Sequence, residues 1–360
     1  MNYRRTTILA EKSYTADATE TFDLRISKPI SRIDIAYRVT KGNNYMSAQP
    51  AADITKVELV DGSDVLFALT GWEMQALNIY DRKVPTMNYG QHISGSYEYS
   101  TYGLDFGRYL WDKELALDPN RFDNLQLKIT FTIATCDTGG TPVYIEITGF
   151  VFDEKEITPI GFLSPKELYS YTPSANDTYR YIELPTARVL RQLLIRGAEM
   201  GYDPHETVVE AKIDEDNDAR VVFDMDLEDY NRMNKGVFPM VQEQMVGYIH
   251  TGADHIFYVT PTDMCLIAAG TPQTGDAAVY SNSYPRGGKI DLRCTNSTMF
   301  SGMAMGWLPN HCISLPFGNQ GDVDDWYDVT KVGDLRLRLK SGSRGTSGTI
   351  QVVTQQLRKY

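Results

Sequence analysis

Two acidic runs contain the side chains whose type and spacing come closest to a metal site. The run Asp214-Glu215-Asp216-Asn217-Asp218 begins like a calcium loop, but Ala219 stands where an EF-hand requires glycine and Met225 where it requires glutamate. A second cluster follows Gly321. Carboxylate oxygens are preferred ligands of Ca²⁺. The cluster is therefore a candidate structural calcium site, with an ordinary solvated loop as the alternative: Asp322, Asp324, Asp325 and Asp328.

The histidines offer little for catalysis. The sequence has five, and only His250 and His255 lie near each other and near the acids Glu243 and Asp254. Solvated loop positions explain this spacing better than a metal site on adjacent strands does. The strings HExxH, GxSxG, GxGxxG and the P-loop do not occur. The sequence therefore assigns no catalytic and no cofactor-binding residue, and we expect a protein that is not an enzyme.

Composition and charge exclude several other classes. At 360 residues the chain is long enough for about two domains. The net charge of -12 argues against a phosphate-binding surface over the whole protein, so we expect no sequence-specific nucleic-acid partner. The 23 tyrosines suit strand faces and broad interfaces. The four cysteines are far apart, which predicts buried thiols: Cys136, Cys265, Cys294 and Cys312.

Most of the chain follows the period of two that is typical of β-strands. In residues 124–133 the apolar side chains alternate strictly with polar ones, which predicts a strand with one face on a core. The same alternation occurs at 33–37, 143–147 and 335–339. Helical patterns are few and short: 71–80, 165–169 and 227–233. Many short strands separated by turns predict a sandwich or a barrel.

The two halves repeat this pattern. Ile30–Val39 corresponds to Val189–Gly197, and the stretch Leu59–Asp64 to Ile213–Asp218. Later landmarks keep the same order, with Phe106 matching Phe317, Leu125 matching Leu335, and a final strand in each half at 144–152 and 349–357. Residue identity is weak, so the repeat is one of architecture. It predicts two similar sandwiches, joined by a Pro-rich and polar linker at 153–178.

The repeat also gives Asp61 and Asp64 a structural role. Because both halves place acidic residues between two strands and before a helix, Val60-Asp61-Gly62-Ser63-Asp64 is best interpreted as a hairpin turn. The helix that follows should pack Trp72, Met74 and Leu77 against the sheets.

Three longer stretches resemble the double jelly-roll major capsid proteins of icosahedral viruses. They are ELVDGSDVLFALTGWEMQALNIYDR, YIELPTARVLRQLLIRG and the ending GDLRLRLKSGSRGTSGTIQVVTQQLRKY. The nearest likeness is the corticovirus-type coat protein of membrane-containing bacteriophages. The resemblance covers most of the chain from about Thr21 onward. These strings are typical of a fold and contain no active-site motif.

The resemblance implies an all-β protein of two tandem eight-stranded jelly-roll sandwiches with a few short helices. The expected divisions are an N-terminal segment at 1–20, a first jelly roll at 21–157 and a second at 158–360. It further implies a homotrimeric, pseudo-hexameric capsomer that builds an icosahedral virion shell after assembly in the host cytoplasm. The implied partners are neighbouring capsomers, penton and minor capsid proteins, and an internal lipid membrane. Related capsids bind calcium, which adds support for an ion at 322–328, but an ordinary solvated loop remains the preferred interpretation.

Two regional predictions complete this interpretation. Residues 240–310, rich in Gly, Thr, Ser and Asn, make the second half longer and should form ordered loops that project outward and join the threefold contact. Residues 1–20 should face the particle interior, where Arg4, Arg5 and Lys12 contact anionic lipid headgroups or another interior component, with a disordered tail as the alternative. For the chain as a whole, the alternative function is a carbohydrate-binding β-sandwich, such as a virion spike or a lectin-like module.

Overall fold

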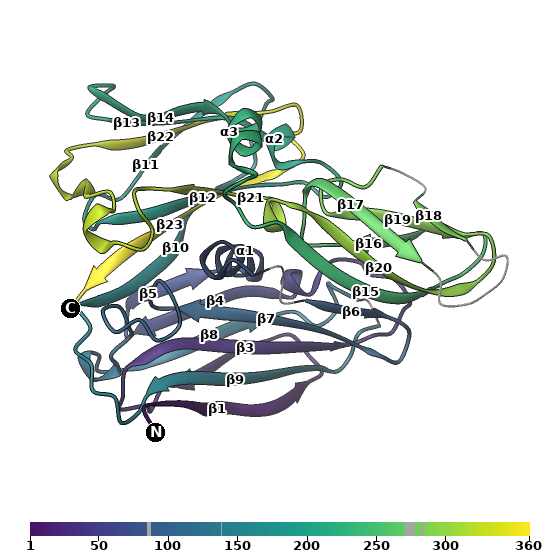
Figure 1. The fold of residues 1–360 in the computed structure, drawn as a ribbon, viewed down its shortest axis with the longest axis horizontal. Coiled ribbons are helices and arrows are strands. Elements are labelled where there is room, and N and C mark those ends of the chain that lie inside the picture. Colours follow the sequence, from purple (N-terminus) through teal and green to yellow (C-terminus); the bar gives the residue numbers. More distant parts are fainter. Residues whose placement is uncertain (85–87, 138, 271–277, 282–283) are drawn as a thin grey trace.

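The structure is a computed structural model that describes residues 1–84, 88–137, 139–270, 278–281 and 284–360, with backbone alone for 264–270. The chain folds into two β-sandwiches, one from each half of the sequence, and a strand-rich insertion extends from the second sandwich to one side (Figure 1).

Eight strands form the first sandwich. One layer has the order β1-β9-β3-β7 and the other β2-β8-β4-β5, so consecutive strands mostly alternate between layers, as in a jelly roll. The bounds are β1 Tyr3–Tyr14, β2 Ala18–Asp23, β3 Ile30–Thr40, β4 Ile54–Asp61, β5 Asp64–Leu69, β7 Tyr97–Asp105, β8 Leu125–Phe131 and β9 Val143–Phe152.

The second sandwich repeats this order. Its layers are β10-β23-β12-β21 and β11-β22-β13-β14. The bounds are β10 Gly161–Tyr171, β11 Tyr179–Glu183, β12 Leu190–Ala198, β13 Val208–Glu215, β14 Arg220–Asp226, β21 Cys312–Pro316, β22 Leu335–Ser341 and β23 Thr349–Lys359. The predicted fold class, a double jelly roll with few helices, is confirmed.

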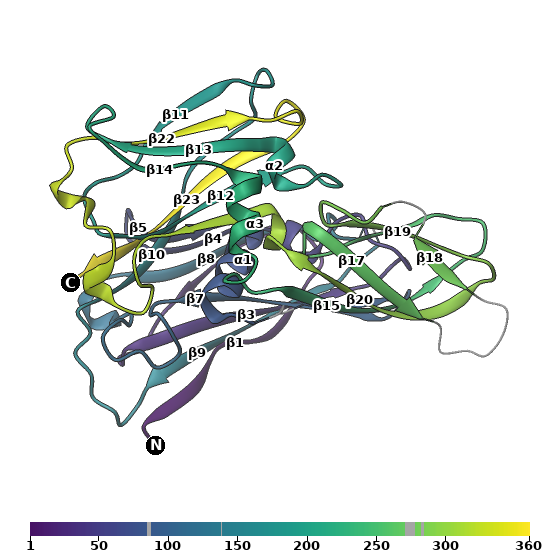
Figure 2. The ribbon, with the colours of Figure 1, turned by 45° about the horizontal axis from the view of Figure 1, so that its top comes forward.

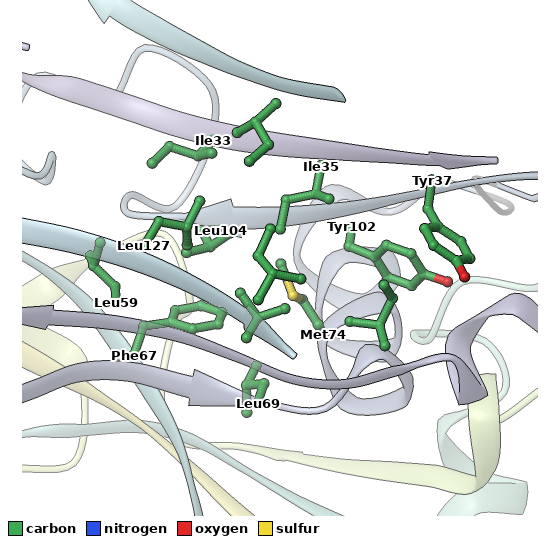
Figure 3. Close-up of a cluster of buried hydrophobic side chains, with 14 of the residues drawn as sticks. Ile33, Ile35, Tyr37, Leu59, Phe67, Leu69, Met74, Tyr102, Leu104 and Leu127 are labelled. Carbon is green, nitrogen blue, oxygen red and sulfur yellow. The ribbon is translucent and has the colours of Figure 1, made fainter. Parts of the chain in front are cut away.

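Each sandwich buries the apolar set that alternation predicts. In the first, Ile33, Ile35 and Tyr37 from β3 face Leu59 and the side chains of the opposite layer (Figure 3). In the second, β22 contributes Leu335, Leu337 and Leu339 to a separate core. Cys136, Cys294 and Cys312 are buried free thiols, as predicted, whereas the side chain of Cys265 lies outside the described residues.

Matched β-bulges fix the correspondence between the two halves. In the β4–β5 hairpin the register shifts just after the pair in which Leu59 lies opposite Phe67. In the β13–β14 hairpin it shifts just after the pair in which Ile213 lies opposite Phe223. The β1–β9 and β10–β23 pairs also shift at matching points, and so do β3–β9 and β12–β23. Because bulges are specific features of a ladder, Phe67 corresponds to Phe223, two residues beyond the match that the sequence repeat gives for this strand.

Three α-helices and the insertion complete the chain. The helices are α1 Gly71–Arg82, α2 Pro204–Thr207 and α3 Leu227–Asn234; the 3-10 turns are η1 Pro50–Ala52, η2 Pro119–Arg121, η3 Pro309–His311, η4 Val323–Asp325 and η5 Val329–Lys331. The remaining strands are β6 Tyr89–His92, β15 Val241–Ile249, β16 His255–Tyr258, β17 Asp263–Gly270, β18 Val279–Ser281, β19 Lys289–Cys294 and β20 Thr298–Trp307. The strands β15–β20 lie within the long region predicted at 240–310.

The structure corrects three sequence-based predictions. Residues 165–169 are part of strand β10 and do not form a helix. Pro165 is tolerated there because β10 borders its neighbour β5 through a single residue pair. The expected linker at 153–178 therefore contains a strand of the second sandwich. The division at residue 20 is also misplaced, since β1 lies in the first sandwich and pairs with β9.

Candidate assembly surfaces

Helix α1 fills the space between the two sandwiches (Figure 2). A capping box starts the helix, in which Thr70 and Glu73 each bond the other's backbone N–H. Its residues from Gly71 to Tyr80 are buried except for Trp72, which is partly buried. Met74 and Leu77 join the core of the first sandwich, as predicted. The other side of the helix meets β21 and the turn before it, and its end is hydrogen-bonded to β12.

Buried polar contacts fasten α1 to the second sandwich. The Asp81 carboxylate accepts hydrogen bonds from Arg191 at 2.8 Å, from Gln192 at 2.8 Å and from Gln355 at 3.0 Å. The Tyr80 hydroxyl donates to the carbonyl of Cys312 at 2.7 Å. Every one of these groups is shielded from water, so the loss of one partner would leave a buried charge or dipole unpaired.

A second polar cluster lies nearer the start of α1. Asn310 donates to the Trp72 carbonyl at 3.2 Å and to Gln75 at 3.1 Å, and the Arg196 guanidinium lies 5.0 Å from the Trp72 ring centre. Burial and the nearby carboxyl of Glu167 raise the pKa of Glu73 to about 8, and burial lowers the pKa of Arg196. Glu73 is thus largely protonated at neutral pH, which removes the cost of burying its charge.

The same contact also joins two sheets. Strand β5 of the first sandwich runs parallel to β10 of the second, with Ala68 opposite Lys166. The junction makes one eight-stranded sheet out of a layer from each sandwich. Outside the junction, Arg358 on β23 pairs with Asp64 on β5, with 3.1 Å between one nitrogen–oxygen pair. Helix, sheet and ion pairs together make the two sandwiches one continuous structure.

The surfaces that correspond to this contact are open on the other side of the chain. Helix α3, the counterpart of α1, buries only Leu227 and Asn231 among its residues. Met233 in its last turn and Val237 after its end are 62% and 70% exposed. On the first sandwich, the outer face of β3, β7 and β9 carries half-buried Arg38 against the rings of Tyr97 and Tyr144. Its counterpart on the second sandwich is covered by α1.

The insertion extends the first sandwich, although it belongs to the second half of the chain. Strand β15 pairs in parallel with β6, so β15, β20 and β17 continue the layer of β1, β9, β3 and β7. The insertion has its own small core, which includes Met245, Phe257 and Phe300. It extends away from both chain termini (Figure 1).

A buried charge cluster lies where the insertion meets the first sandwich. The Lys41 ammonium is 2.9 Å from Asp137 and 3.5 Å from Glu98. Burial raises the pKa of Glu98 to about 7, although Lys41 opposes the shift, and burial lowers the pKa of His92 to about 3. The cluster is enclosed by protein, so it fixes the geometry of the junction and offers no access to a substrate.

The predicted calcium residues do not form an ion site. Asp322 and Asp328 cap the turns η4 and η5 through the backbone N–H groups of Asp324 and Thr330. Asp325 accepts from the Asn319 N–H at 2.6 Å. Among the described residues no group of three or more His, Cys, Asp or Glu side chains is arranged to hold a metal ion. The residues present therefore do not fit Ca²⁺ as a shared ligand set.

The candidate histidine cluster is likewise dispersed. The rings of His250 and His255 lie 5.9 Å apart, but Glu243 is buried and accepts from the Thr260 N–H at 2.7 Å. Asp254 is paired with Arg293 at the surface. No helix within the described ranges is long and apolar enough to cross a membrane.

Sequence reasoning missed the polar residues that join the sandwiches. Arg191, Gln192 and Arg196 interrupt an otherwise apolar strand, and Glu73, Gln75 and Asn78 lie in a helix with no solvated face. The sequence of both segments does contain a sign of this contact. A strand or helix that buries one apolar face and has polar groups on its opposite face requires either water or another polar surface against that opposite face. The sequence alone does not distinguish these two.

Comparisons with known proteins agree on the fold. No protein-family profile and no curated protein sequence matches the chain significantly. Among solved structures, the MCP of STIV is similar with a TM-score of 0.61 at 9% identity, covering 99% of this chain and 98% of that one. The major capsid protein P2 from bacteriophage PM2 gives 0.56 at 11% identity, with 99% and 98% covered. The PBCV-1 virus capsid gives 0.53 at 11% identity, with 98% and 94% covered. At such low identities the shared property is the double jelly-roll fold along the whole chain.

Proposed function

We propose that this protein is a major capsid protein that forms homotrimers and builds an icosahedral virus shell, and that it is not an enzyme. The observation that carries the proposal is the match in fold, over nearly the full length of both chains, to capsid proteins of three different viruses. A match over both sandwiches is more specific than a match to a single jelly roll, which many unrelated functions share.

The internal repeat supports a ring of three copies. Each chain already makes one contact between α1 of its first sandwich and the layer β10-β23-β12-β21 of its second. The open α3 and the open outer face of β3, β7 and β9 are the two halves of a second such contact. A head-to-tail contact of this kind closes into a ring when its rotation allows. Three chains with two sandwiches each would give a capsomer with pseudo-sixfold outline.

The remaining partners are also proposals. Capsomers would contact neighbouring capsomers, penton proteins and minor capsid proteins within the virion, after assembly in the host cytoplasm. The insertion at 240–310 would project from the outer face of the shell, because it extends to the side away from both termini. An internal lipid membrane would lie on the side of the shell where the two chain termini are, opposite the insertion. A sequence-specific nucleic-acid contact is not part of the proposal.

Size-exclusion chromatography with light scattering, followed by negative-stain imaging, tests the proposal. We expect a species of about 120 kDa, three times the chain mass of 40.6 kDa, and hexagonal particles or shells. A carbohydrate-binding module would instead remain a monomer or small oligomer and show saturable binding on a glycan array. A monodisperse monomer that never assembles would overturn the capsid assignment.

A further inference from the structure

Two of the open sheet edges in the described part of the chain have counterparts that are joined to each other. Strand β14 is the last strand of the layer β11-β22-β13-β14, and β1 is the first strand of the layer that begins β1-β9-β3. The counterpart of β14 in the first sandwich is β5, and the counterpart of β1 in the second sandwich is β10. These two counterparts lie side by side and run parallel. The chain therefore makes this edge-to-edge contact once and leaves one unused copy of each edge.

The matched bulges show which residues correspond. The hairpin bulges make Phe67 and Phe223 equivalent, so Ala68 on β5 corresponds to Asp224 on β14. The bulges after Thr7 in β1 and after Glu167 in β10 make Lys166 correspond to Thr6. Both helices also begin at equivalent points, since their N-caps Thr70 and Asp226 lie at the same distance along the chain from Phe67 and Phe223.

The open edges β14 and β1 are less buried than the joined edges β5 and β10, as expected if a neighbouring strand and layer are missing beside them. On β5, Leu66, Phe67 and Leu69 are at most 1% exposed. Their counterparts on β14, Val222, Phe223 and Met225, are only half-buried. The first five residues of β10 are all buried, whereas Arg4 and Arg5 on β1 are exposed. Both open edges thus lack the layer that covers their joined counterparts.

The two open edges are also complementary in charge. Asp224, Glu228 and Asp229 are exposed on β14 and at the start of α3. Arg4 and Arg5 are exposed beside Thr6 on β1. Arg4 is 3.5 Å from Asp153, and Arg5 lies 5.1 Å from the ring centre of Phe150, so both are held at the surface of the strand. Opposite charge guides two surfaces into register and disfavours the contact of like edges.

We propose that β14 of one copy pairs in parallel with β1 of a second copy, with Asp224 opposite Thr6, as β5 pairs with β10 within each chain. This inference rests on the proposed self-assembly and specifies its contact. The pairing would join the layer of β14 to the layer of β1 of the next copy, and α3 would then lie over the outer face of that copy's first sandwich. Because the contact is head-to-tail, each copy uses both edges, and a closed ring leaves neither exposed.

Cysteine cross-linking tests the register directly. Opposite residues on paired strands lie about 4.8 Å apart, which suits a disulfide. In the assembled protein, Thr6→Cys with Asp224→Cys should give covalent dimers and trimers on non-reducing gels after mild oxidation. Ala68→Cys with Lys166→Cys is the matched control and should close within one chain, at monomer mobility. The described native cysteines are buried and should not compete; the otherwise unaltered chain measures any background from Cys265.

A charge exchange tests whether the edges recognise each other. Arg4→Glu with Arg5→Glu should shift the trimer peak toward the monomer in chromatography, and adding Asp224→Arg with Glu228→Arg should restore most of the trimer. Arg25→Glu with Lys28→Glu changes the net charge equally at exposed positions after β2 and should leave the trimer intact. Circular dichroism melting of each variant separates loss of assembly from loss of folding.

The outcomes separate this inference from the proposed function. A trimer that forms but gives no Thr6–Asp224 cross-link, or whose charge exchange is not restored, overturns the edge pairing and leaves the capsid assignment standing. A Thr6–Asp224 link that migrates as a monomer also overturns it. A chain that never assembles overturns both.

Discussion

The two sandwiches have the same strand order and the same bulges, but different surroundings. In the second, the layer β10-β23-β12-β21 is covered on one side by its own core and on the other by α1, so that β12 is buried along nearly its whole length. In the first, the equivalent β3 buries one face and leaves Arg32, Asp34 and Ala36 at least partly exposed. The burial of equivalent strands in this protein is therefore decided by what lies outside each sandwich.

The largest expected difference concerns one pair of equivalent phenylalanines. Phe67→Ala should lower the free energy of unfolding by about 3–5 kcal/mol, because the side chain is 1% exposed and its removal leaves a cavity. Phe223→Ala should cost roughly 1–2 kcal/mol in the isolated subunit, because its side chain is only half-buried. Denaturant unfolding followed by circular dichroism measures both. Equal losses of stability in the two variants would show that β5 and β14 are equally well packed, which would contradict the difference between the two sandwiches.

The next difference compares two ion pairs on the equivalent helices. Arg191→Ala should cost about 3–5 kcal/mol, because it leaves Asp81 buried without its charged partner. Arg232→Ala removes a pair with Asp229 on α3, where both side chains are more than half exposed, and should cost at most about 1 kcal/mol. Thermal melting of the two variants side by side checks this. A small loss for Arg191→Ala would mean that water replaces the guanidinium.

Much of this architecture could be predicted from the sequence, because strand alternation and turn residues are local signals. The alternation at 124–133 and 335–339 located β8 and β22, and the acidic turn located the β4–β5 and β13–β14 hairpins. The pairing of Phe106 with Phe317 also holds, since both follow the last strand before the long loop of their sandwich.

The failures come from non-local contacts. Residues 165–169 were expected to be a helix, but they form a strand because they pair with β23 near the other end of the sequence, a contact that no local pattern shows. The N-terminal strand β1 was missed for a related reason, since its ladder contains two register shifts that break the period of two. The calcium prediction is of another kind, because it relied on acidic residues that are close in sequence, and Asp322, Asp325 and Asp328 bond backbone N–H groups of their own loop.

A smaller effect should appear as a pH dependence of the contact between the sandwiches. Burial raises the pKa of Glu73 to about 8 from its ordinary value near 4.5, so folding takes up a proton between these values. The stability that this group contributes is complete below about pH 4.5 and is lost as the pH rises through about 8. Glu73→Gln keeps the capping acceptor of Thr70. It should therefore flatten the fall in melting temperature between pH 5 and 8.

The control for this experiment is the equivalent acid on the other helix. Asp229 is, like Glu73, the third residue of its helix, but it is exposed. Asp229→Asn should leave the pH profile of the melting temperature almost unchanged. If Glu73→Gln and Asp229→Asn have the same profile as the unaltered chain, the proton is not taken up at the contact between the sandwiches.

The smallest expected effect concerns the acidic loop of the second sandwich and its counterpart in the first. In the first sandwich, Asp112 is held by Arg108 at 2.7 Å. In the second, Asp325 is held by the Asn319 N–H at 2.6 Å, and Asp328 by Thr330 and Lys331. Neither loop needs a cation to balance converging carboxylates, so EGTA should not change the melting temperature of the trimer or the integrity of shells. The Asp328 pKa lies near 2, because Thr330 and Lys331 bond its carboxylate, so its small contribution to stability should disappear only as the pH falls from about 4 to 2. A drop in melting temperature on chelation that added Ca²⁺ reverses, and that Asp325→Asn abolishes, would instead place an ion in this loop.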